Sequence, residues 1–333
     1  MPLRLGILGM WHVHADGLVK QIAAHPDEFH LTGGFDPEPD VVQQRQASWS
    51  DLLPDFKWHT SANELLNEPL DGIVVEGRVH ENLRWARLAL ESGRPVLLEK
   101  PAGVNLVEFR NLLELANTRR LHVQLIYLFR FMSAVQELLT RVRRRELGQI
   151  YEFRARLPKD LRDYAGYVED LGRYPGGIFF EMAGHVVDLL VTIMGTPKTI
   201  SPFLAHHHPT AGTFIDNGVA VFGMEHGWGI IEVPALEVAP HSRRIEVYGT
   251  EGACVIPHLG SGHLGNRQVQ PIEIFRKGQA DWETLEPAAA TLQIGDLREF
   301  AAVLANRKTP DHSLEHDLLV QEVLLKASGM LAL

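Results

Sequence analysis

The sequence predicts an α/β protein built from a doubly wound parallel sheet and a second domain rich in antiparallel strands. The first third of the chain alternates short apolar strands with helical spacing, which is the pattern of repeated βα units. After about Tyr127 the rhythm changes to strand-like runs separated by turn residues. A length of 333 residues exceeds what one hydrophobic core ordinarily serves, so two domains are expected.

The first third contains five short apolar runs, and helical spacing follows most of them. Short buried strands joined through helices form parallel sheets, and right-handed crossovers make such sheets doubly wound. The expected strands are LRLGILG, HLTGGFD, DGIVVEG, RPVLLEKP and LHVQLIYLFR. The expected helices run from about His12 to Ala24, over HENLRWARLALESG with its end at Gly93, and over NLVEFRNLLELANTRR.

The rest of the chain predicts strands that follow one another directly. Turn residues between these runs favour antiparallel pairing. We place the domain boundary so that the first domain covers residues 1–123 and the second covers 124–333. The expected strands are GQIYEFRARL, GVAVFGM, WGIIEVP, RRIEVYG, ACVIP and IEIFR, and the expected helices lie near 178–193, from about Gly295 to Ala305 and from Leu314 to Ser328.

Composition excludes several function classes. The formal net charge of −10 argues against nucleic acid and anionic membranes as partners, because both need basic surfaces. The single cysteine, Cys254, excludes an intramolecular disulfide and a thiolate metal cluster, which fits a reducing compartment. The best candidate for a membrane span, GGIFFEMAGHVVDLLVTIMG, is interrupted by Glu181, His185 and Asp188. We therefore expect a cytoplasmic protein with neither a signal peptide nor a membrane span.

The segment LGILGMWHVHADG allows two interpretations. An extended chain points His12 and His14 to the same side, as a metal site requires. A strand-turn-helix segment can instead carry the G-x-G-x-x-G fingerprint of a dinucleotide loop, here with Gly9 first, Trp11 second and His14 third. Because the βα alternation stops too early for a metal-dependent hydrolase barrel, we predict a dinucleotide loop. His12 and His14 are then expected beside the cofactor, and no metal is expected.

Asp36 ends the second expected strand. An acid at this position can accept hydrogen bonds from both ribose hydroxyls and repels a 2′-phosphate. No lysine or arginine follows until Arg45, so NAD is favoured over NADP. Asp36 also precedes a proline, and in that position an aspartate often starts a turn.

A second polar segment follows the strand in VLLEKPAG. The strand delivers Glu99, Lys100 and Pro101 to its carboxyl end, where open α/β sheets bind ligands. A lysine fixed there can donate to a substrate hydroxyl and favour its alkoxide character. The alternative is a solvated surface pair between Glu99 and Lys100.

The segment GGIFFEMAGHVVDLL combines an apolar helix with one ionisable stripe. Glu181, His185 and Asp188 are spaced by four and three residues, which places them on one helix face. His185 can exchange a proton near neutrality without a large pKa shift, and a neighbouring carboxylate can fix its tautomer. The alternative is a buried structural Glu-His pair.

These residues resemble the Gfo/Idh/MocA oxidoreductases (glucose-fructose oxidoreductase, inositol dehydrogenase and relatives). Glu99-Lys100-Pro101 matches the family's EKP motif, and GGIFFEMAGHVVDLL resembles its D-x-x-x-H-x-x-D helix. The resemblance extends in order over nearly the whole chain, through VVEGRVHENLRWARLALESGRPVLLEKP, YGTEGACVI and FAAVLANRKTPDHSLEHDLLVQEVLLKASG. Three residues depart from the pattern: Trp11, His14, and Glu181, which stands where the family usually has an aspartate.

The resemblance implies an N-terminal Rossmann domain, a C-terminal α+β domain with a large open, mostly antiparallel sheet, and dimers or tetramers built on that sheet. It also implies NAD(P)-dependent oxidation or reduction of a sugar, polyol or sugar acid, with Lys100 as catalytic lysine, His185 as catalytic histidine and Asp36 at the ribose. The expected catalytic residues are Lys100, His185 and Glu181, the last orienting His185. The expected cofactor contacts are Gly9, Met10, Trp11, His12, Asp36, Glu76, His80, Glu99, Lys100 and Pro101, and the expected substrate contacts are Tyr127, Arg130, Arg156 and Asp188.

Three alternatives remain open from the sequence. An NAD-dependent glycosidase of the same fold would oxidise transiently and turn over an aryl glycoside without net NADH. A non-enzymatic sensor would bind NAD and a sugar to regulate a partner. A metal hydrolase or lyase would use His12, His14, Glu181, His185 or the His206–His208 run, although adjacent histidines tend to diverge.

Overall fold

The computed structural model describes residues 1–208, 212–259, 270–287 and 294–332. The chain divides into two compact units, each described separately below. The first comprises Met1–Tyr127 with Leu292–Leu318, and the second comprises Leu128–Thr291 with Leu319–Leu333. The domain boundary predicted from the sequence, between residues 123 and 124, assigned Leu292–Leu318 to the second domain. The structure groups that segment with the first unit.

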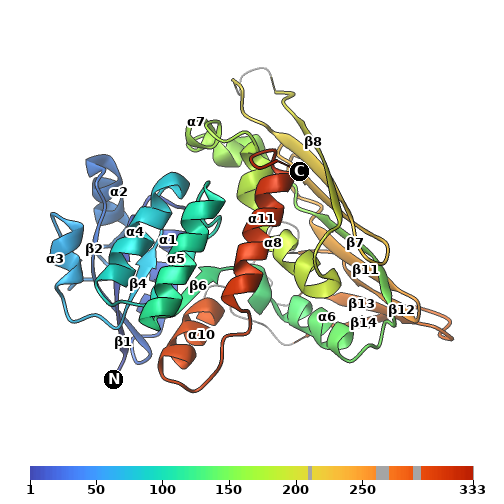
Figure 1. Ribbon diagram of the computed structural model, residues 1–333, viewed down its shortest axis with the longest axis horizontal. Helices are drawn as coiled ribbons and strands as arrows, with labels where there is room; N and C mark the ends of the chain where they lie inside the picture. Colours follow the sequence, from blue (N-terminus) through green and yellow to red (C-terminus); the bar gives the residue numbers. More distant parts are fainter. Residues whose placement is uncertain (209–211, 260–269, 288–293, 333) are drawn as a thin grey trace. The chain divides into compact units, whose positions relative to one another are not determined.

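The first unit contains a six-stranded parallel sheet in the order β3-β2-β1-β4-β5-β6 (Figure 1). This confirms the predicted doubly wound sheet, and Gly93 follows its helix with a φ of 81°, as predicted for a C′ glycine. The strands are β1 (Leu3–Leu8), β2 (Phe29–Phe35), β3 (Lys57–Trp58), β4 (Gly72–Val75), β5 (Val96–Glu99) and β6 (Val123–Ile126). The helices are α1 (His14–Ala24), α2 (Pro39–Trp49), α3 (Ala62–Leu66), α4 (Val79–Glu91), α5 (Leu106–Arg119) and α10 (Ile294–Leu304), while α11 (Leu314–Ala327) begins in this unit and ends in the second.

Helix α10 returns to the first unit through long-range packing. The ring of Phe300 lies against Gly72 of β4, where an added Cβ would approach it to 2.8 Å. Gln124 of β6 donates from Nε2 to the carbonyl of Asp296 at 2.9 Å. Neither contact can be predicted from the local spacing of apolar residues. The boundary predicted from the sequence therefore placed α10 in the second domain.

Strand β1 lies where the sheet's strand order reverses. Leu8 at its end pairs in register with Phe35 of β2 on one side and with Val75 of β4 on the other. Ligands of open α/β sheets bind outside the carboxyl ends of the strands at such a switch point. The residues that follow β1, β4 and β5 are therefore placed at the expected ligand crevice.

The second unit contains an eight-stranded, mostly antiparallel sheet in the order β14-β13-β12-β11-β7-β10-β9-β8, with β7 and β10 paired in parallel (Figure 1). This confirms the predicted class of the C-terminal domain. The strands are β7 (Ile150–Arg156), β8 (Thr199–Ala205), β9 (Asn217–Gly223), β10 (Trp228–Pro234), β11 (Arg244–Gly249), β12 (Gly252–Ile256), β13 (Ile272–Arg276) and β14 (Glu283–Leu285). The helical segments are η1 (Leu128–Phe131), α6 (Ser133–Arg143), η2 (Leu161–Tyr164), α7 (Val168–Leu171) and α8 (Gly177–Met194).

Helix α8 forms the core of the second unit. It packs against β10, β9 and β7, and Leu190 approaches Gly229 so closely that a Cβ there would lie 2.6 Å from its side chain. By length and composition α8 is the single described helix that could cross a membrane, yet 83% of it is buried inside the protein. Packing inside the protein therefore explains why α8 carries apolar residues around most of its surface.

Several elements differ from the sequence expectations. The strand expected over LHVQLIYLFR ends at Ile126 and is followed by the 3-10 helix η1. Strand β8 was not predicted. It contains Pro202, which is tolerated there because β8 is an edge strand. The other unpredicted elements are α2, β3, α3, α6, α7, η2 and β14.

Candidate active site

The loop after β1 requires glycine at its first position. Gly9 has a φ of 71°, and an added Cβ would lie 2.5 Å from the Cα of Gly77, which follows β4. Its amide donates to the carbonyl of Phe35 at 2.9 Å. The loops after β1 and β4 thus meet backbone to backbone across the switch point, and only glycine at position 9 permits that approach.

Asp36 binds this loop through its carboxylate. Its oxygens accept from the amide of Met10 at 2.6 Å and from the amide of Glu38 at 2.9 Å. The side chain is buried, and burial raises its pKa against the lowering effect of these hydrogen bonds. A carboxylate offers about four acceptor positions, so the two amide bonds leave capacity for ribose hydroxyls. Both earlier interpretations of Asp36, turn residue and ribose ligand, are compatible with this geometry.

Arg45 of α2 holds the loop from the other side. Its Nε donates to the carbonyl of Met10 at 2.7 Å, and its Nη2 donates to those of Trp11 and His12 at 3.2 and 3.0 Å. Its Nη1 lies 2.8 Å from Asp16. The sequence analysis treated Arg45 only as the next basic residue after Asp36, because α2 was not predicted and nothing local marks an arginine as a loop clamp.

We expect replacement of Arg45 by alanine to destabilise the protein by about 1–3 kcal/mol, because buried carbonyls then lose their donor. The midpoint of urea unfolding measures this. Arg110→Ala, an exposed arginine on α5, is the matched control and is expected to leave the midpoint unchanged. Equal midpoints for the two variants would show that Arg45 does not hold the loop.

The loop amides are largely engaged within the chain. The amide of His12 donates to the carbonyl of Glu76 at 2.9 Å, that of His14 to Nδ1 of His12 at 3.3 Å, and that of Ala15 to the carbonyl of His12 at 3.2 Å. In a glycine-rich fingerprint such amides face the pyrophosphate. A bound dinucleotide would therefore be held at its ribose by Asp36 and at its nicotinamide by Lys100. The loop amides that would hold its pyrophosphate are largely engaged elsewhere.

A buried ionisable cluster lies at the ends of β1, β4 and β5. Nδ1 of His12 is 3.5 Å from Oε2 of Glu76 and 3.8 Å from Oε1 of Glu99. Nδ1 of His14 is 3.1 Å from the same Oε1 of Glu99, and Nζ of Lys100 is 3.8 Å from it. Both glutamates are fully buried, and Lys100 is 1% exposed. The alternative of a solvated surface pair between Glu99 and Lys100 is therefore wrong.

Burial and mutual repulsion control the protonation of this cluster. Burial raises the pKa of Glu76 to about 8, and the neighbouring charge of Glu99 acts in the same direction. Burial lowers the pKa of His14, which keeps its imidazole neutral at physiological pH. The pKa of Glu99 is lowered, because the nearby histidines and Lys100 together outweigh its desolvation.

The remaining predicted cofactor residues line the same edge of the sheet. Trp11 is half-buried, and the guanidinium of Arg78 lies 4.6 Å from the centre of its ring. Arg78 in turn binds Glu38 through two hydrogen bonds of 2.5 and 2.7 Å. Met10 and Pro101 are buried, whereas His80 is exposed in the first turn of α4. No local pattern in the sequence predicts the Arg78–Glu38 pair, whose two residues lie 40 positions apart in the chain.

In the second unit, α8 presents three buried ionisable side chains. Glu181, His185 and Asp188 are 5%, 3% and 0% exposed. The ring of His185 stacks on Phe129, with centroids 4.5 Å apart and an interplanar angle of 16°. This stacking fixes the plane of the imidazole, which the sequence did not show.

Two of the predicted substrate residues bind each other. Arg130 donates from Nε and Nη2 to the two carboxylate oxygens of Asp188, at 2.9 and 2.6 Å. The side chains of Arg130 and Asp188 are 6% and 1% exposed, so this bidentate pair is buried. Arg156 of β7 instead donates to Glu237 at 2.5 Å and to Ser242. Tyr127, at the end of β6, is fully buried in the first unit.

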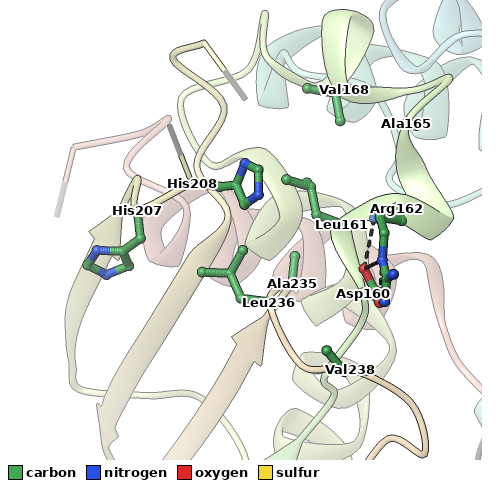
Figure 2. A pocket seen from close by; sticks show the side chains of 10 residues that line it. All are labelled: Asp160, Leu161, Arg162, Ala165, Val168, His207, His208, Ala235, Leu236 and Val238. Carbon is green, nitrogen blue, oxygen red and sulfur yellow. Dashed lines mark hydrogen bonds and ion pairs between the residues drawn. The ribbon is translucent and has the colours of Figure 1, made fainter. Parts of the chain in front are cut away.

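The second unit also contains a cavity of about 600 Å³ that the sequence analysis did not identify as a site. Figure 2 shows apolar side chains, among them Leu161 and Leu236, with the Asp160–Arg162 pair on one side and His207 and His208 on the other. The Arg162 guanidinium lowers the pKa of Asp160 to about 2. The lining residues do not include the predicted ionisable residues of α8.

Comparison with known proteins shows which family the chain is similar to. The family described as GFO/IDH/MocA C-terminal domain matches residues 135–255. The chain is 25% identical over 281 residues to scyllo-inositol 2-dehydrogenase (NAD(+)) from Bacillus subtilis (strain 168), covering 76% of this chain and 73% of that protein.

Solved structures show the same fold over nearly the full length. UDP-N-acetylglucosamine 3-dehydrogenase from Acidithiobacillus ferrooxidans superposes with a TM-score of 0.80 at 17% identity, covering 99% of this chain and 98% of that one. The WlbA dehydrogenase from Bordetella pertussis, in complex with NADH and UDP-GlcNAcA, superposes with a TM-score of 0.76 at 19% identity, covering 99% and 97%. Taken with the EKP segment at the end of β5 and the histidine helix α8, these matches show that the chain is similar to the Gfo/Idh/MocA oxidoreductases.

Proposed function

We propose that this oxidoreductase transfers hydride between a nicotinamide cofactor, NAD(H) in preference to NADP(H), and a secondary alcohol or ketone of a sugar, polyol or sugar acid. The observation that carries the proposal is Lys100, which is 1% exposed and stands directly after β5 at the switch-point edge of a parallel sheet. The relatives support the substrate class, because their names specify an inositol and nucleotide sugars.

The roles of the chain's own residues follow from their chemistry. A bound nicotinamide supplies the hydride acceptor or donor. Lys100 holds the reacting oxygen and stabilises the negative charge that develops on it. His185, held in plane by Phe129, takes the hydroxyl proton, and Glu181 orients the imidazole. Arg130 and Asp188 bind each other and so fix the position of this part of α8. Asp188 would also accept a hydrogen bond from a substrate hydroxyl.

Preference for NAD is proposed from Asp36. Its buried carboxylate lies at the end of β2, where it would meet the hydroxyls of the adenosine ribose and repel a 2′-phosphate. Arg45 is fully engaged with loop carbonyls and Asp16, so it is not placed to bind that phosphate.

Calorimetric titration with NAD, NADH, NADP and NADPH tests the cofactor, followed by a polyol and sugar panel read at the NADH absorbance band. Tight binding of NAD(H) with weak binding of NADP(H), and NADH formation with one of these substrates, is expected. Turnover of an aryl glycoside without net NADH would identify the glycosidase alternative instead. NAD binding without turnover of any substrate would identify the sensor alternative.

We also propose a homodimer or homotetramer that uses the sheet face opposite α8. The pairing register places Phe203 of β8, Val219 of β9 and Glu232 of β10 in one row on that face. Phe203 is 65% exposed, and Trp228, which lies on the same face four residues before Glu232, is 49% exposed. Exposed aromatic side chains on a flat sheet face are typical of protein interfaces.

Replacing Phe203 by glutamate is expected to shift the protein toward monomers without lowering its unfolding temperature, because a charge would be buried in the interface while the fold keeps its core. Analytical ultracentrifugation measures the shift. Val238→Glu, an exposed apolar residue beyond the end of β10, serves as the control. An unchanged oligomeric state in the Phe203 variant would place the interface elsewhere.

A further inference from the structure

The cluster at the ends of β1, β4 and β5 contains the ligand types of a metal centre. We propose that His12, His14 and Glu99, with Glu76 as a fourth ligand, bind one divalent transition-metal ion in the first unit. This goes beyond the proposed dehydrogenase function and departs from the sequence expectation that these histidines only border a cofactor.

The spacing of the donor atoms fits a single ion. One ligand atom each from His12, His14 and Glu99 lie within 4.8 Å of one another. Bonds of about 2.0–2.2 Å to nitrogen and oxygen place tetrahedral ligands about 3.3–3.6 Å apart. Nδ1 of His14 lies 3.1 Å from Oε1 of Glu99, and the His12 ring lies 3.8 Å from the same oxygen and 3.5 Å from Oε2 of Glu76, so the side chains already lie near the separations of ligands that share one ion.

Buried carboxylate oxygens in the cluster favour the binding of a cation. Both oxygens of Glu76 and Oε2 of Glu99 are buried and have no hydrogen-bond partner within the part of the chain that the structure describes. Buried carboxylates are ordinarily paired, hydrogen-bonded or bound to a metal. A divalent ion would supply the coordination that these oxygens do not receive from hydrogen bonds.

The donor set selects the class of metal. Two imidazole nitrogens with carboxylate oxygens suit Zn²⁺, Co²⁺ or Fe²⁺, whereas Mg²⁺ and Ca²⁺ prefer sites made of oxygen alone. Arg45 holds the carbonyl of His12, which limits movement of the loop. The side chain of His14 is 23% exposed, so an ion has access to the site from solvent.

Titration with Co²⁺ alone tests the site on the full chain after dialysis against a chelator. We expect one Co²⁺ per chain and visible absorption bands of a low-symmetry cobalt complex with nitrogen ligands. His14→Gln and Glu99→Gln, which avoid large cavities, are each expected to weaken Co²⁺ binding at least about 100-fold, because loss of a ligand exceeds the roughly 10- to 100-fold cost of losing an outer-shell contact. His30→Ala removes an exposed histidine of β2 and is the matched control.

The comparison among these proteins decides the inference. Equal Co²⁺ affinity in the wild type, the ligand variants and the His30 variant overturns it, as does failure of the folded wild type to bind Co²⁺. If one ligand variant fails to fold by circular dichroism, the other carries the comparison. NADH is titrated separately into the chelated protein: Co²⁺ binding without NADH binding supports the metal site and contradicts the proposed cofactor, whereas NADH binding without Co²⁺ binding overturns the metal site alone.

Discussion

Replacing Lys100 by methionine is expected to lower kcat/KM by about 10²- to 10⁴-fold, the range associated with a positioned proton-transfer or charge-stabilising group. Methionine approximates the length and apolar stem of lysine but offers no donor to the reacting oxygen. Because Lys100 is 1% exposed and follows β5, the loss should arise in the chemical step. Steady-state kinetics on the identified substrate, with NADH affinity measured in parallel, separates kcat from binding.

Lys57→Met is the matched control for this substitution. Lys57 lies on β3 of the same sheet, is mostly exposed, and pairs with Glu68 at 2.9 Å. It is expected to keep wild-type kinetics. Near-normal turnover of the folded Lys100 variant would remove Lys100 from the mechanism, whereas loss of NADH binding would assign it to cofactor binding only.

Replacing Arg130 by alanine is expected to cost about 3–5 kcal/mol of folding free energy, because it removes the cation that faces a buried carboxylate. The side chain of Asp188 is 1% exposed and accepts both hydrogen bonds of the pair. Guanidinium unfolding, followed by a probe in the second unit, measures the change. Activity should fall as well, since Asp188 and His185 share one face of α8.

Two controls separate the charge effect from general damage. The double variant Arg130→Met with Asp188→Leu replaces both charges by apolar groups and is expected to recover much of the lost stability. Arg162→Ala removes one partner of the exposed Asp160–Arg162 pair and is expected to leave the unfolding midpoint unchanged. A loss for the double variant as large as that for Arg130→Ala would mean that packing, and not the unpaired charge, sets the cost.

Local periodicity was sufficient to predict both sheets. Apolar strands followed by helices predicted the parallel sheet, and direct succession of strands predicted the antiparallel one. The same local reasoning placed Lys100 after a buried strand and put Glu181, His185 and Asp188 on one helix. These are properties of single elements, which a sequence encodes through burial patterns of fixed period.

The partners of these residues were decided by tertiary structure alone. Arg45 clamps three carbonyls of a loop more than 30 residues away, and Arg130 meets Asp188 across 58 residues. Glu76 joins His12 because β1 and β4 are neighbours in the sheet although five other elements separate them in the sequence.

Strand order brings such side chains together, and a local pattern carries no information on that order. The sequence by itself therefore determined the fold class and the elements that carry the chemistry. The tertiary structure decided that the loop histidines meet two buried carboxylates, because only the packed sheet places the ends of β1, β4 and β5 side by side.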